Sequence, residues 1–393
     1  MLPFPEAAAD WPVLCRGRHT CGIRLHRPAD DEGVRTVSGS NPSSQVKMSL
    51  FRKFFQDIIR DRHPDGDTVK VKGKVKPKYY GTVTPYPNFN ASSDAQVLKS
   101  AIETKGVDED VIIAVLVRRN NEQRQKIKAV YEASTDRKLD SDLKSALRSD
   151  LEDVSLALLM TPAQFDAHLI RKATKRFGTD EDVLVEVLAS RTNQEIRELK
   201  KAFREEYEVE LEDVIKDETS GDFTAALLAM LAAKKDEDHD VDAELAESDA
   251  KTLFEAGENS KGIDVSTFIE ILTTRSGPQL TRTFQEYADV SDLTLPKALF
   301  LELKGDIEDC LVDIVKCAWS KPAFFAEKLH KAMEGRGTCE KTLIRILVSR
   351  SEIDLKKIVE EYRAMYDVSL QEHILHDTEG HYQKVLLGLC GPH

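Results

Sequence analysis

Four segments of the chain repeat the same residue types at the same distances from a glycine. An arginine follows each glycine by 13 positions, a helix-capping residue by 14, an aromatic residue by 25 and, in three of the four segments, an acid by 40. Such self-similarity over about 70 to 85 residues indicates an array of one structural unit. The capping residue and the residue three positions later form a capping-box pattern or a close variant, which predicts a helix start. The repeated residues are Gly106, Gly178, Gly262 and Gly337; Arg119, Arg191, Arg275 and Arg350; Asn120, Thr192, Ser276 and Ser351; Gln123, Glu195, Gln279 and Asp354; Tyr131, Phe203, Tyr287 and Tyr362; and Ala146, Glu218, Glu302 and Asp377.

Apolar residues within each unit recur at three-to-four spacing, which is the period of a helix. In the first unit this spacing predicts helices at residues 95–104, 110–118, 123–134, 141–148 and 153–160. Alternating β-type runs are absent, so we expect an all-α fold of four repeats with about five helices each. We place repeat one at 89–160, repeat two at 161–232, an acidic linker at 233–243, repeat three at 244–316 and repeat four at 317–393.

The chain before the repeats divides into two parts. Residues 1–47 are rich in Pro, Gly, Arg and Asp without apolar periodicity, so we expect a disordered extension and hypothesise that Met48 is the natural start. From Met48 to Arg60 six large apolar residues fall on one helical face, and a basic linker completes residues 48–88. Such a helix needs a partner, which can be the protein's own body, a groove of another protein or a membrane interface.

The charge balance limits the class of partner. Lys and Arg total 56 against 69 acids, and the net charge of −13 argues against nucleic acid and against unaided adhesion to an anionic membrane. A cation would have to mediate membrane contact. The six cysteines show no CxxC pairs, and the N-terminus has no basic start followed by a long apolar run, so we expect a reducing, cytosolic environment, no signal peptide and no transmembrane span.

The fourth unit combines residues that suit a metal ion. Its loop runs from Met333 through Gly335 and Gly337 to Thr338, and Asp377 lies forty residues after Gly337. Glycines let a short loop turn several carbonyl oxygens toward one point. Carbonyls with one chelating carboxylate suit Ca²⁺, whereas Mg²⁺ prefers a tighter octahedron and Zn²⁺ prefers His or Cys. A single loop of this kind usually only ends a helix, but recurrence with an acid at a fixed offset favours calcium.

Other recurring or clustered residues have simpler interpretations. The four arginines sit at helix ends, where a cation complements the helix dipole and hydrogen-bonds carbonyls, so we interpret them as structural. The four aromatic residues lie on apolar stripes and are expected in the core. The spacing of His373, His376 and His381 could hold zinc, but no cysteine joins them, and we do not favour that site.

At these residues the chain resembles the annexins. The segments that carry the resemblance are TVTPYPNFN (82–90), TPAQFDA (161–167), LELKGDIED (301–309) and SKPAFFAEKLHKAM (320–333), and the likeness extends from about residue 82 to 390. It implies a curved disc of four five-helix repeats that binds acidic phospholipid membranes through Ca²⁺ loops on its convex face. It also implies that the segment from Met48 to Arg60 is a regulatory helix, which can dock into an EF-hand dimer or engage a second membrane.

The resemblance carries calcium ligands to particular residues of this chain. The fourth site matches at Met333, Gly335, Gly337 and Asp377, with Thr338 and Glu340 for a minor site. The third matches at Gly257, Ser260, Gly262 and Glu302. The second keeps Thr174, Gly178, Thr179, Glu181 and Glu218, but Arg176 replaces its first loop glycine. The first lacks the acid at Ala146 and matches only minor sites, at Gly106, Val107 and Glu109 and at Lys144, Leu147 and Glu152.

Two departures bear on function. A non-glycine at Arg176 costs of order 1 kcal/mol if that position needs a positive φ, so we expect a weaker second site. Cys339 stands where two other loops have Asp108 and Asp180, which places a thiol beside the fourth site and leaves redox sensitivity open.

The resemblance further implies a cytoplasmic protein that is peripheral on plasma and endosomal membranes when calcium rises, with nuclear or unconventionally secreted pools, and a phospholipase A2 inhibitor activity. The alternative is a helical-repeat scaffold that binds proteins without a calcium switch. Catalysis is not expected, because no Ser-His-acid spacing, Walker loop, dinucleotide fingerprint or zinc-hydrolase motif stands out.

Overall fold

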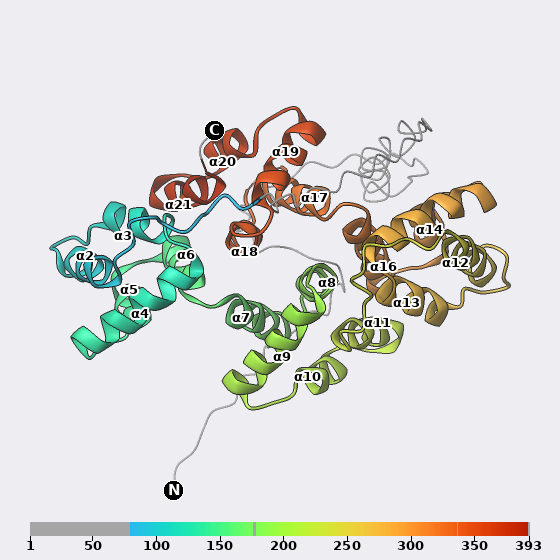
Figure 1. Cartoon of the computed structure of the whole chain (residues 1–393), viewed down its shortest axis with the longest axis horizontal. Helices are drawn as coiled ribbons and strands as arrows, with labels where there is room; N and C mark the ends of the chain where they lie inside the picture. Colours follow the sequence, from blue (N-terminus) through green and yellow to red (C-terminus); the bar gives the residue numbers. More distant parts are fainter. Residues whose placement is uncertain (1–78, 176–177, 336, 392–393) are drawn as a thin grey trace, which may run out of the picture. The chain divides into compact units, whose positions relative to one another are not determined.

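The computed structural model describes residues 79–175, 178–335 and 337–391, which belong to one compact unit, Ser38–His393. The expected extension 1–47, the helix from Met48 to Arg60 and Arg176 lie outside the described residues. Within them the chain forms twenty α-helices and no strand, in four groups of five (Figure 1). No described helix combines the length and apolar character that crossing a bilayer would need.

The helices follow the repeat. Repeat one contains α2 (Ala91–Glu103), α3 (Glu109–Leu116), α4 (Asn121–Thr135), α5 (Leu139–Ala146) and α6 (Ser149–Leu159). Repeat two contains α7 (Pro162–Thr174), α8 (Glu181–Ser190), α9 (Asn193–Tyr207), α10 (Leu211–Glu218) and α11 (Gly221–Leu231). Repeat three contains α12 (Ala243–Ala256), α13 (Val265–Thr274), α14 (Gly277–Val290), α15 (Leu295–Glu302) and α16 (Asp306–Trp319). Repeat four contains α17 (Lys321–Met333), α18 (Glu340–Arg350), α19 (Leu355–Tyr366), α20 (Leu370–Asp377) and α21 (Gly380–Cys390).

Helix starts are set by the capping residues that the sequence repeats. Asn120 and Gln123 form a complete capping box at α4, and Thr192 and Glu195 form another at α9. These boxes satisfy amides that have no partner inside the helix. The prediction for the fourth repeat is wrong, because Ser351 is the C-cap residue of α18 and Asp354 is the residue before α19.

The repeated arginines have one structural role in three repeats and a different one in the fourth. Arg119, Arg191 and Arg275 each make a bidentate ion pair with an aspartate of the first helix of their repeat, at Asp94, Asp166 and Asp249. They are therefore structural, as expected, but their main partner is a carboxylate and not a helix carbonyl.

Repeat four lacks that aspartate. Phe325 occupies the position 25 residues before Arg350, and the guanidinium lies 4.8 Å from the Phe325 ring centroid. Arg350 pairs instead with Asp354, at 2.8 Å. Because the Asp354 carboxylate is held by Arg350, it does not cap the start of the helix as the sequence pattern predicted.

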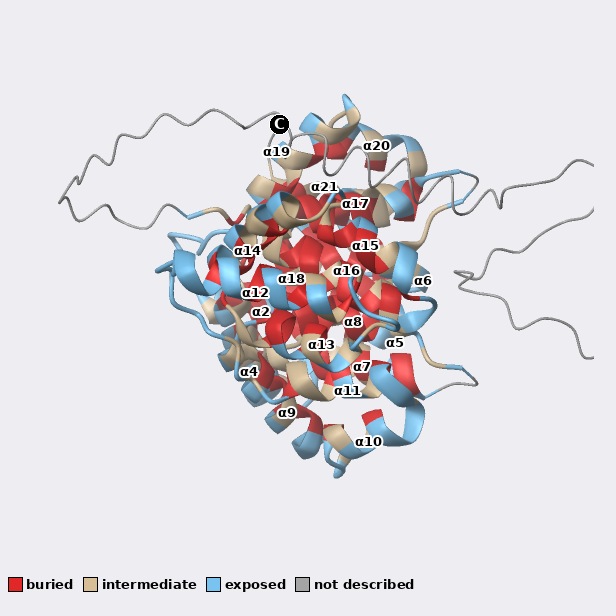
Figure 2. Cartoon of the chain, turned by 90° about the vertical axis from the view of Figure 1, so that its right-hand side faces the viewer, coloured by how far each residue is buried: buried red, intermediate tan, exposed pale blue. Residues whose placement is uncertain are grey.

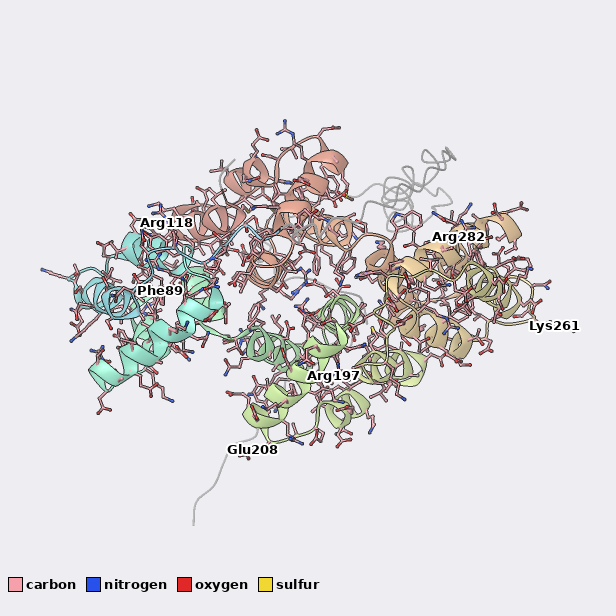
Figure 3. All side chains as sticks on the ribbon, viewed as in Figure 1. Phe89, Arg118, Arg197, Glu208, Lys261 and Arg282 are labelled. Carbon is pink, nitrogen blue, oxygen red and sulfur yellow. The ribbon has the colours of Figure 1, made fainter. Side chains whose placement is uncertain are left out.

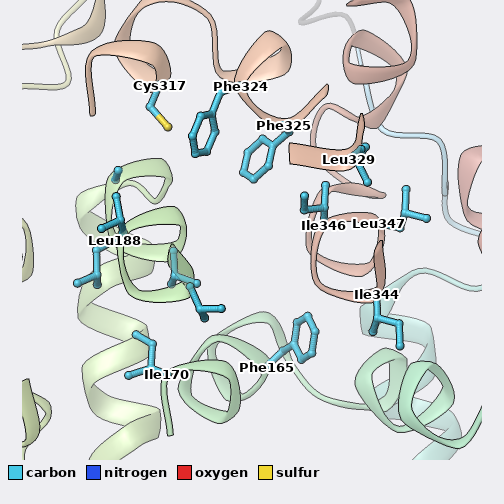
Figure 4. Packing of buried hydrophobic residues seen from close by; sticks show 14 of the residues in the cluster. Phe165, Ile170, Leu188, Cys317, Phe324, Phe325, Leu329, Ile344, Ile346 and Leu347 are labelled. Atoms are coloured by element: carbon cyan, nitrogen blue, oxygen red, sulfur yellow. The ribbon is translucent and has the colours of Figure 1, made fainter. Parts of the chain in front are cut away.

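The core runs through each repeat and between repeats, and Figure 2 shows the buried residues concentrated inside the helical layer. The first helix of each repeat packs on the third, as in α2 with α4 and α17 with α19. All four repeated aromatic residues are fully buried, which confirms their assignment to the core. Figure 4 shows apolar side chains of α7, α8, α17 and α18, including Phe165, Leu188 and Phe325, where repeats two and four approach each other.

Contacts between repeats do not follow the chain order alone. Repeat one packs on repeat four through α3 with α21 and α6 with α18, and repeat two packs on repeat three through α8 with α16 and α11 with α13. Repeats two and four are joined by a buried bidentate ion pair between Glu186 and Arg345, with both distances 2.8 Å. Nearby, Glu327 is paired with Lys316 and Lys331.

A strap of residues 79–90 precedes α2 and joins repeats one and four. The amides of Thr82 and Val83 donate to the Ser351 carbonyl at 2.7 and 3.0 Å, and the Thr82 hydroxyl donates to the Leu389 carbonyl at 2.6 Å. Further along, the Tyr86 amide donates to the Gln123 side chain at 2.9 Å. The N-terminal end of the described chain is therefore fixed to both repeats.

Candidate functional site

The loop between the first and second helix closes in the same way in every repeat. The amide of the residue before the second helix donates to a carbonyl near the end of the first, in the pairs Asp108–Ala101, Asp180–Ala173, Asp264–Ala256 and Cys339–Ala332 at 2.7 to 3.0 Å. The partners are seven residues apart in repeats one, two and four and eight apart in repeat three. Repeat three therefore has one extra loop residue.

Glycines give these loops a backbone that other residues rarely adopt. Gly106, Gly178, Gly335 and Gly337 have φ between +93° and +99°. A side chain at such a φ is strained even where space is open, and no atom lies within 4 Å of a Cβ built at Gly335. Repeat two has Arg176 where repeat four has Gly335. We expected a weaker second site if the position of Arg176 needs a positive φ. The equivalent Gly335 in repeat four has a positive φ, so that condition is met there.

The structure brings the loop and the distant acid together in repeats two and four. The Thr338 hydroxyl donates to the main-chain carbonyl of Asp377 at 3.1 Å, and the Thr179 hydroxyl donates to that of Glu218 at 3.1 Å. Each acid is the last residue of the fourth helix of its repeat. The main chain of each acid is therefore joined to a loop threonine 39 residues earlier, and the role of its carboxylate as a ligand stays a prediction.

Repeat three lacks this threonine, because Ile263 follows Gly262. The Ser260 hydroxyl instead donates to the Gly262 carbonyl, and the loop residue Glu258 accepts hydrogen bonds from the hydroxyls of Tyr287 and Ser291. Burial raises the pKa of Tyr287, and the carboxylates of Glu258 and then Glu302 raise it further. Figure 3 shows Lys261 of this loop at the outer edge of its helical group.

Repeat one has no acid at the end of its fourth helix, where Ala146 stands, and Val107 replaces the threonine. The carboxylate of the predicted minor ligand Glu109 contacts Nδ1 of His381 in repeat four, and the neighbouring Asp110 pairs with Lys384 at 2.6 Å. A calcium ion there would have to compete with His381 for the Glu109 carboxylate.

At the second predicted minor site of repeat one, a nearby side chain already hydrogen-bonds one of the predicted ligands. The Leu147 carbonyl accepts a hydrogen bond from the Arg148 guanidinium at 2.6 Å. Lys144 and Leu147 could contribute only main-chain oxygens, and Glu152 follows in the first turn of α6. The arrangement provides main-chain and carboxylate oxygens, which suit calcium, but the Arg148 guanidinium already lies beside the Leu147 carbonyl.

The remaining predicted ligands lie at the same loops. Glu181 and Glu340 are the first residues of α8 and α18, as Glu109 is of α3. Met333 and Thr174 are buried at the ends of α17 and α7, so each could offer only its main-chain carbonyl to an ion. Gly257 ends α12 with a negative φ of −112°, unlike the loop glycines of repeat four.

A second glycine position was not recognised in the sequence. Forty-three residues after the loop glycine come Ser149, Gly221, Gly305 and Gly380, with φ of +54°, +64°, +79° and +66°. Ser149, Gly221 and Gly380 are the first residues of the fifth helices and Gly305 immediately precedes one, so each turns the chain three residues after the acid position. The fixed offset, with glycine in three of the four repeats, was the signal that could have revealed this turn.

The histidines around Asp377 point to different partners. His376 is highly exposed and its Nδ1 lies 2.7 Å from Asp377 Oδ1. His373 Nδ1 is hydrogen-bonded to the Tyr362 hydroxyl, at 2.5 Å, and His381 pairs with Glu109. Among the described residues, no group of three or more His, Cys, Asp or Glu side chains is placed to hold a metal ion. The prediction that each loop offers carbonyl oxygens with a single carboxylate does not require such a group.

Cys339 is partly exposed and begins the turn into α18. Where Asp108 and Asp180 accept a hydrogen bond from the amide three residues later, Cys339 makes no such bond. Its sulfur lies 3.3 Å from the Thr342 hydroxyl. The thiol thus replaces a helix cap at the fourth loop.

Comparisons with known proteins agree with this geometry. The annexin family model matches residues 93–158, 165–230, 248–314 and 324–389. Annexin A1 of Homo sapiens is 57% identical over 344 residues, which cover 88% of this chain and 99% of that protein. Annexin A1 of Rattus norvegicus is 54% identical with the same coverage.

Solved structures give the same result. Annexin III superposes with a TM-score of 0.79 at 44% identity and covers 80% of this chain and 98% of its own. Calcium-bound annexin (Sm)1 superposes with a TM-score of 0.72 at 31% identity, covering 80% and 93%. The predicted all-α fold of four five-helix repeats is confirmed. The chain belongs to the annexin family of calcium-dependent phospholipid-binding proteins, is similar to annexin A1 over 88% of its length, and takes Ca²⁺ as its cofactor.

Proposed function

We propose that this chain binds acidic phospholipid membranes through Ca²⁺ held mainly at the loops of repeats four and three, more weakly at repeat two and least at repeat one. The observation that carries the proposal is the hydrogen bond between Thr338 and the Asp377 carbonyl, with its counterpart between Thr179 and Glu218. These bonds join the residue that carries each carboxylate to a loop that contains glycines of positive φ. Open coordination positions on Ca²⁺ would then take phosphate oxygens of the lipid.

The ligands we propose follow from what each loop offers. Repeat four would use the carbonyls of Met333, Gly335 and Gly337 with the Asp377 carboxylate. Repeat three would use Gly257, Ser260 and Gly262 with Glu302, which is exposed at the end of α15. Repeat two has an exposed Glu218 but carries Arg176 in place of a glycine, and repeat one has only the minor sites, where Glu109 is already paired with His381.

Electrostatics explains why the ion would act as a switch. Without calcium, a chain of net charge −13 meets an anionic leaflet with repulsion, screened by salt within about 10 Å. Each bound ion adds two positive charges, so three or four sites supply roughly +6 to +8 at the lipid-binding surface. Calcium and lipid then raise each other's affinity through linkage, and several weak sites acting together suffice for membrane binding.

We further propose that the segment from Met48 to Arg60 regulates this binding by engaging a protein partner, such as an EF-hand dimer, or a second membrane. Its pattern of six large apolar residues on one face supports the proposal. The expected localisation is cytoplasmic and peripheral on plasma and endosomal membranes when calcium rises.

Vesicle co-sedimentation tests the proposed function. The wild-type chain is expected to pellet with phosphatidylserine vesicles in calcium and to remain in the supernatant with a chelator. Asp377→Asn with Glu302→Gln removes two chelating carboxylates while keeping side-chain size, and should shift the required free calcium upward. Equal pelleting of wild type with and without chelator would overturn the calcium switch and favour a calcium-independent scaffold.

A further inference from the structure

Two exposed leucines lie immediately beside the proposed calcium carboxylates. Among the described large apolar residues that are exposed, the two with the greatest exposed fraction are Leu301, at 52%, and Leu375, at 47%. Leu301 precedes Glu302 by one residue, and Leu375 precedes Asp377 by two, each in the last turn of the fourth helix of its repeat. Single exposed apolar residues are normal on a protein surface, so the informative observation is that both occupy the same place in their repeats.

The other two repeats carry different residues at these positions. The two residues before the acid position are Lys144 and Ser145 in repeat one, Lys216 and Asp217 in repeat two, Phe300 and Leu301 in repeat three, and Leu375 and His376 in repeat four. Apolar residues thus occur here only in repeats three and four, the two repeats whose calcium ligands match most completely.

The exposed leucines are not needed by the core. The apolar face of each helix is supplied by the preceding residues Leu299 and Ile374, both fully buried. Leu301 and Leu375 therefore expose apolar surface that packing within the chain does not use. Substituting them should leave the fold intact.

A basic group accompanies the apolar residues of repeat three. The Lys304 ammonium donates to the Phe300 carbonyl at 2.9 Å and lies 5.2 Å from the Phe300 ring centroid. Lysines beside apolar residues keep the charged head at the polar boundary while the stem lies along apolar surface. This combination is typical of groups that sit at a membrane interface, where the ammonium can meet lipid phosphate.

We propose that Leu301, with Phe300, and Leu375 enter the boundary between the headgroups and acyl chains of an acidic phospholipid leaflet. The inference rests on the proposed function, because calcium bridged between Glu302 or Asp377 and lipid phosphate brings the adjacent residues to the depth of the phosphate layer. Repeats three and four then add an apolar contact to the calcium-mediated one. Repeats one and two meet the headgroups through Lys144 and Lys216.

Substitution by glutamine tests the energetic part of the proposal. Leu301→Gln and Leu375→Gln keep side-chain length and helix propensity and change no charge. At fixed free calcium each is expected to lower affinity for phosphatidylserine–phosphatidylcholine vesicles about tenfold, because half of a leucine side chain no longer leaves water. Calcium binding without lipid, measured by calorimetry, should be unchanged. The matched control is Ile353→Gln, which changes a residue 44% exposed that lies two residues after the strap-binding Ser351, past the end of α18, whereas the fourth loop precedes the start of that helix.

Tryptophan variants test the depth directly. In a background with Trp11→Phe and Trp319→Phe, Leu301→Trp and Leu375→Trp should be quenched by lipids brominated on the acyl chain, in calcium only, whereas Ile353→Trp should not. The inference is overturned if the wild type binds vesicles but the glutamine variants bind equally well and the tryptophans are not quenched. Failure of the wild type to bind in calcium would instead reject the proposed function.

Discussion

The hydrogen bond from the Thr338 hydroxyl to the Asp377 carbonyl offers the sharpest test of how these sites are built. The two residues are 39 positions apart, and the 3.1 Å bond joins the glycine loop to the end of α20. Thr338→Val removes the hydroxyl at nearly constant volume and leaves the loop carbonyls in place. Thr338→Ser keeps the hydroxyl and is the matched control.

The expected magnitude follows from the strength of one neutral hydrogen bond. Such a bond contributes about 0.5 to 1.5 kcal/mol net. If it holds the Asp377 carboxylate at the loop, its loss should weaken calcium binding at the fourth site roughly 2- to 13-fold, because about 1.4 kcal/mol corresponds to a factor of ten.

The measurement needs the fourth site in isolation. Calorimetric titration of Ca²⁺ in a background with Glu218→Gln and Glu302→Gln leaves Asp377 as the only carboxylate at the forty-residue position. The serine variant should match this background, and the valine variant should bind more weakly. Equal dissociation constants for the valine and serine variants would show that this bond does not position the carboxylate.

Three further predictions concern strain, burial and pH. Gly335→Arg, which introduces the residue found in repeat two, should weaken calcium binding at the fourth site about 5- to 30-fold, because a side chain at φ +94° costs about 1 to 2 kcal/mol. Calorimetry measures this affinity, and an unchanged dissociation constant would argue against backbone strain at this position. Arg345→Met should lower the free energy of unfolding by about 3 to 5 kcal/mol in urea, since Glu186 stays buried without its partner, whereas adding Glu186→Leu should recover most of it. Burial alone raises the pKa of Glu327, but its two lysine partners lower it to about 2. Its contribution to stability should therefore be complete above about pH 5 and be lost as the pH falls toward 2, and Glu327→Gln should remove that part of the pH dependence in denaturant titrations.

Local sequence patterns predicted much of the fold. The capping pairs Asn120–Gln123 and Thr192–Glu195 predicted the starts of α4 and α9 because capping depends on residues three positions apart. The same pattern failed at Ser351, because Phe325, distant in sequence, leaves Arg350 without its usual partner and Asp354 replaces it. A partner contributed by another helix cannot be read from a local capping pattern.

The candidate site also has parts that the sequence predicted and a part that was not recognised in it. Recurrence alone identified the loop glycines, the acids Glu218, Glu302 and Asp377, and the missing acid at Ala146. Four copies of one unit repeat whatever each loop needs, so a fixed offset predicts a candidate ligand without a structure. Recurrence also contained the turn at Gly221, Gly305 and Gly380, which was overlooked.

The sequence by itself determined that the chain is an all-helical array with an oxygen-rich loop and a matching acid in most repeats. Hydrophobic period, capping residues and fixed offsets can all be read along one chain without knowledge of its packing. Only the tertiary structure decided which repeats touch. It paired Glu109 of repeat one with His381 of repeat four, and Glu186 with Arg345, and it left Leu301 and Leu375 exposed beside the acids. Contacts of this kind depend on how helices from different repeats pack, and packing brings together residues whose separation along the chain follows no period.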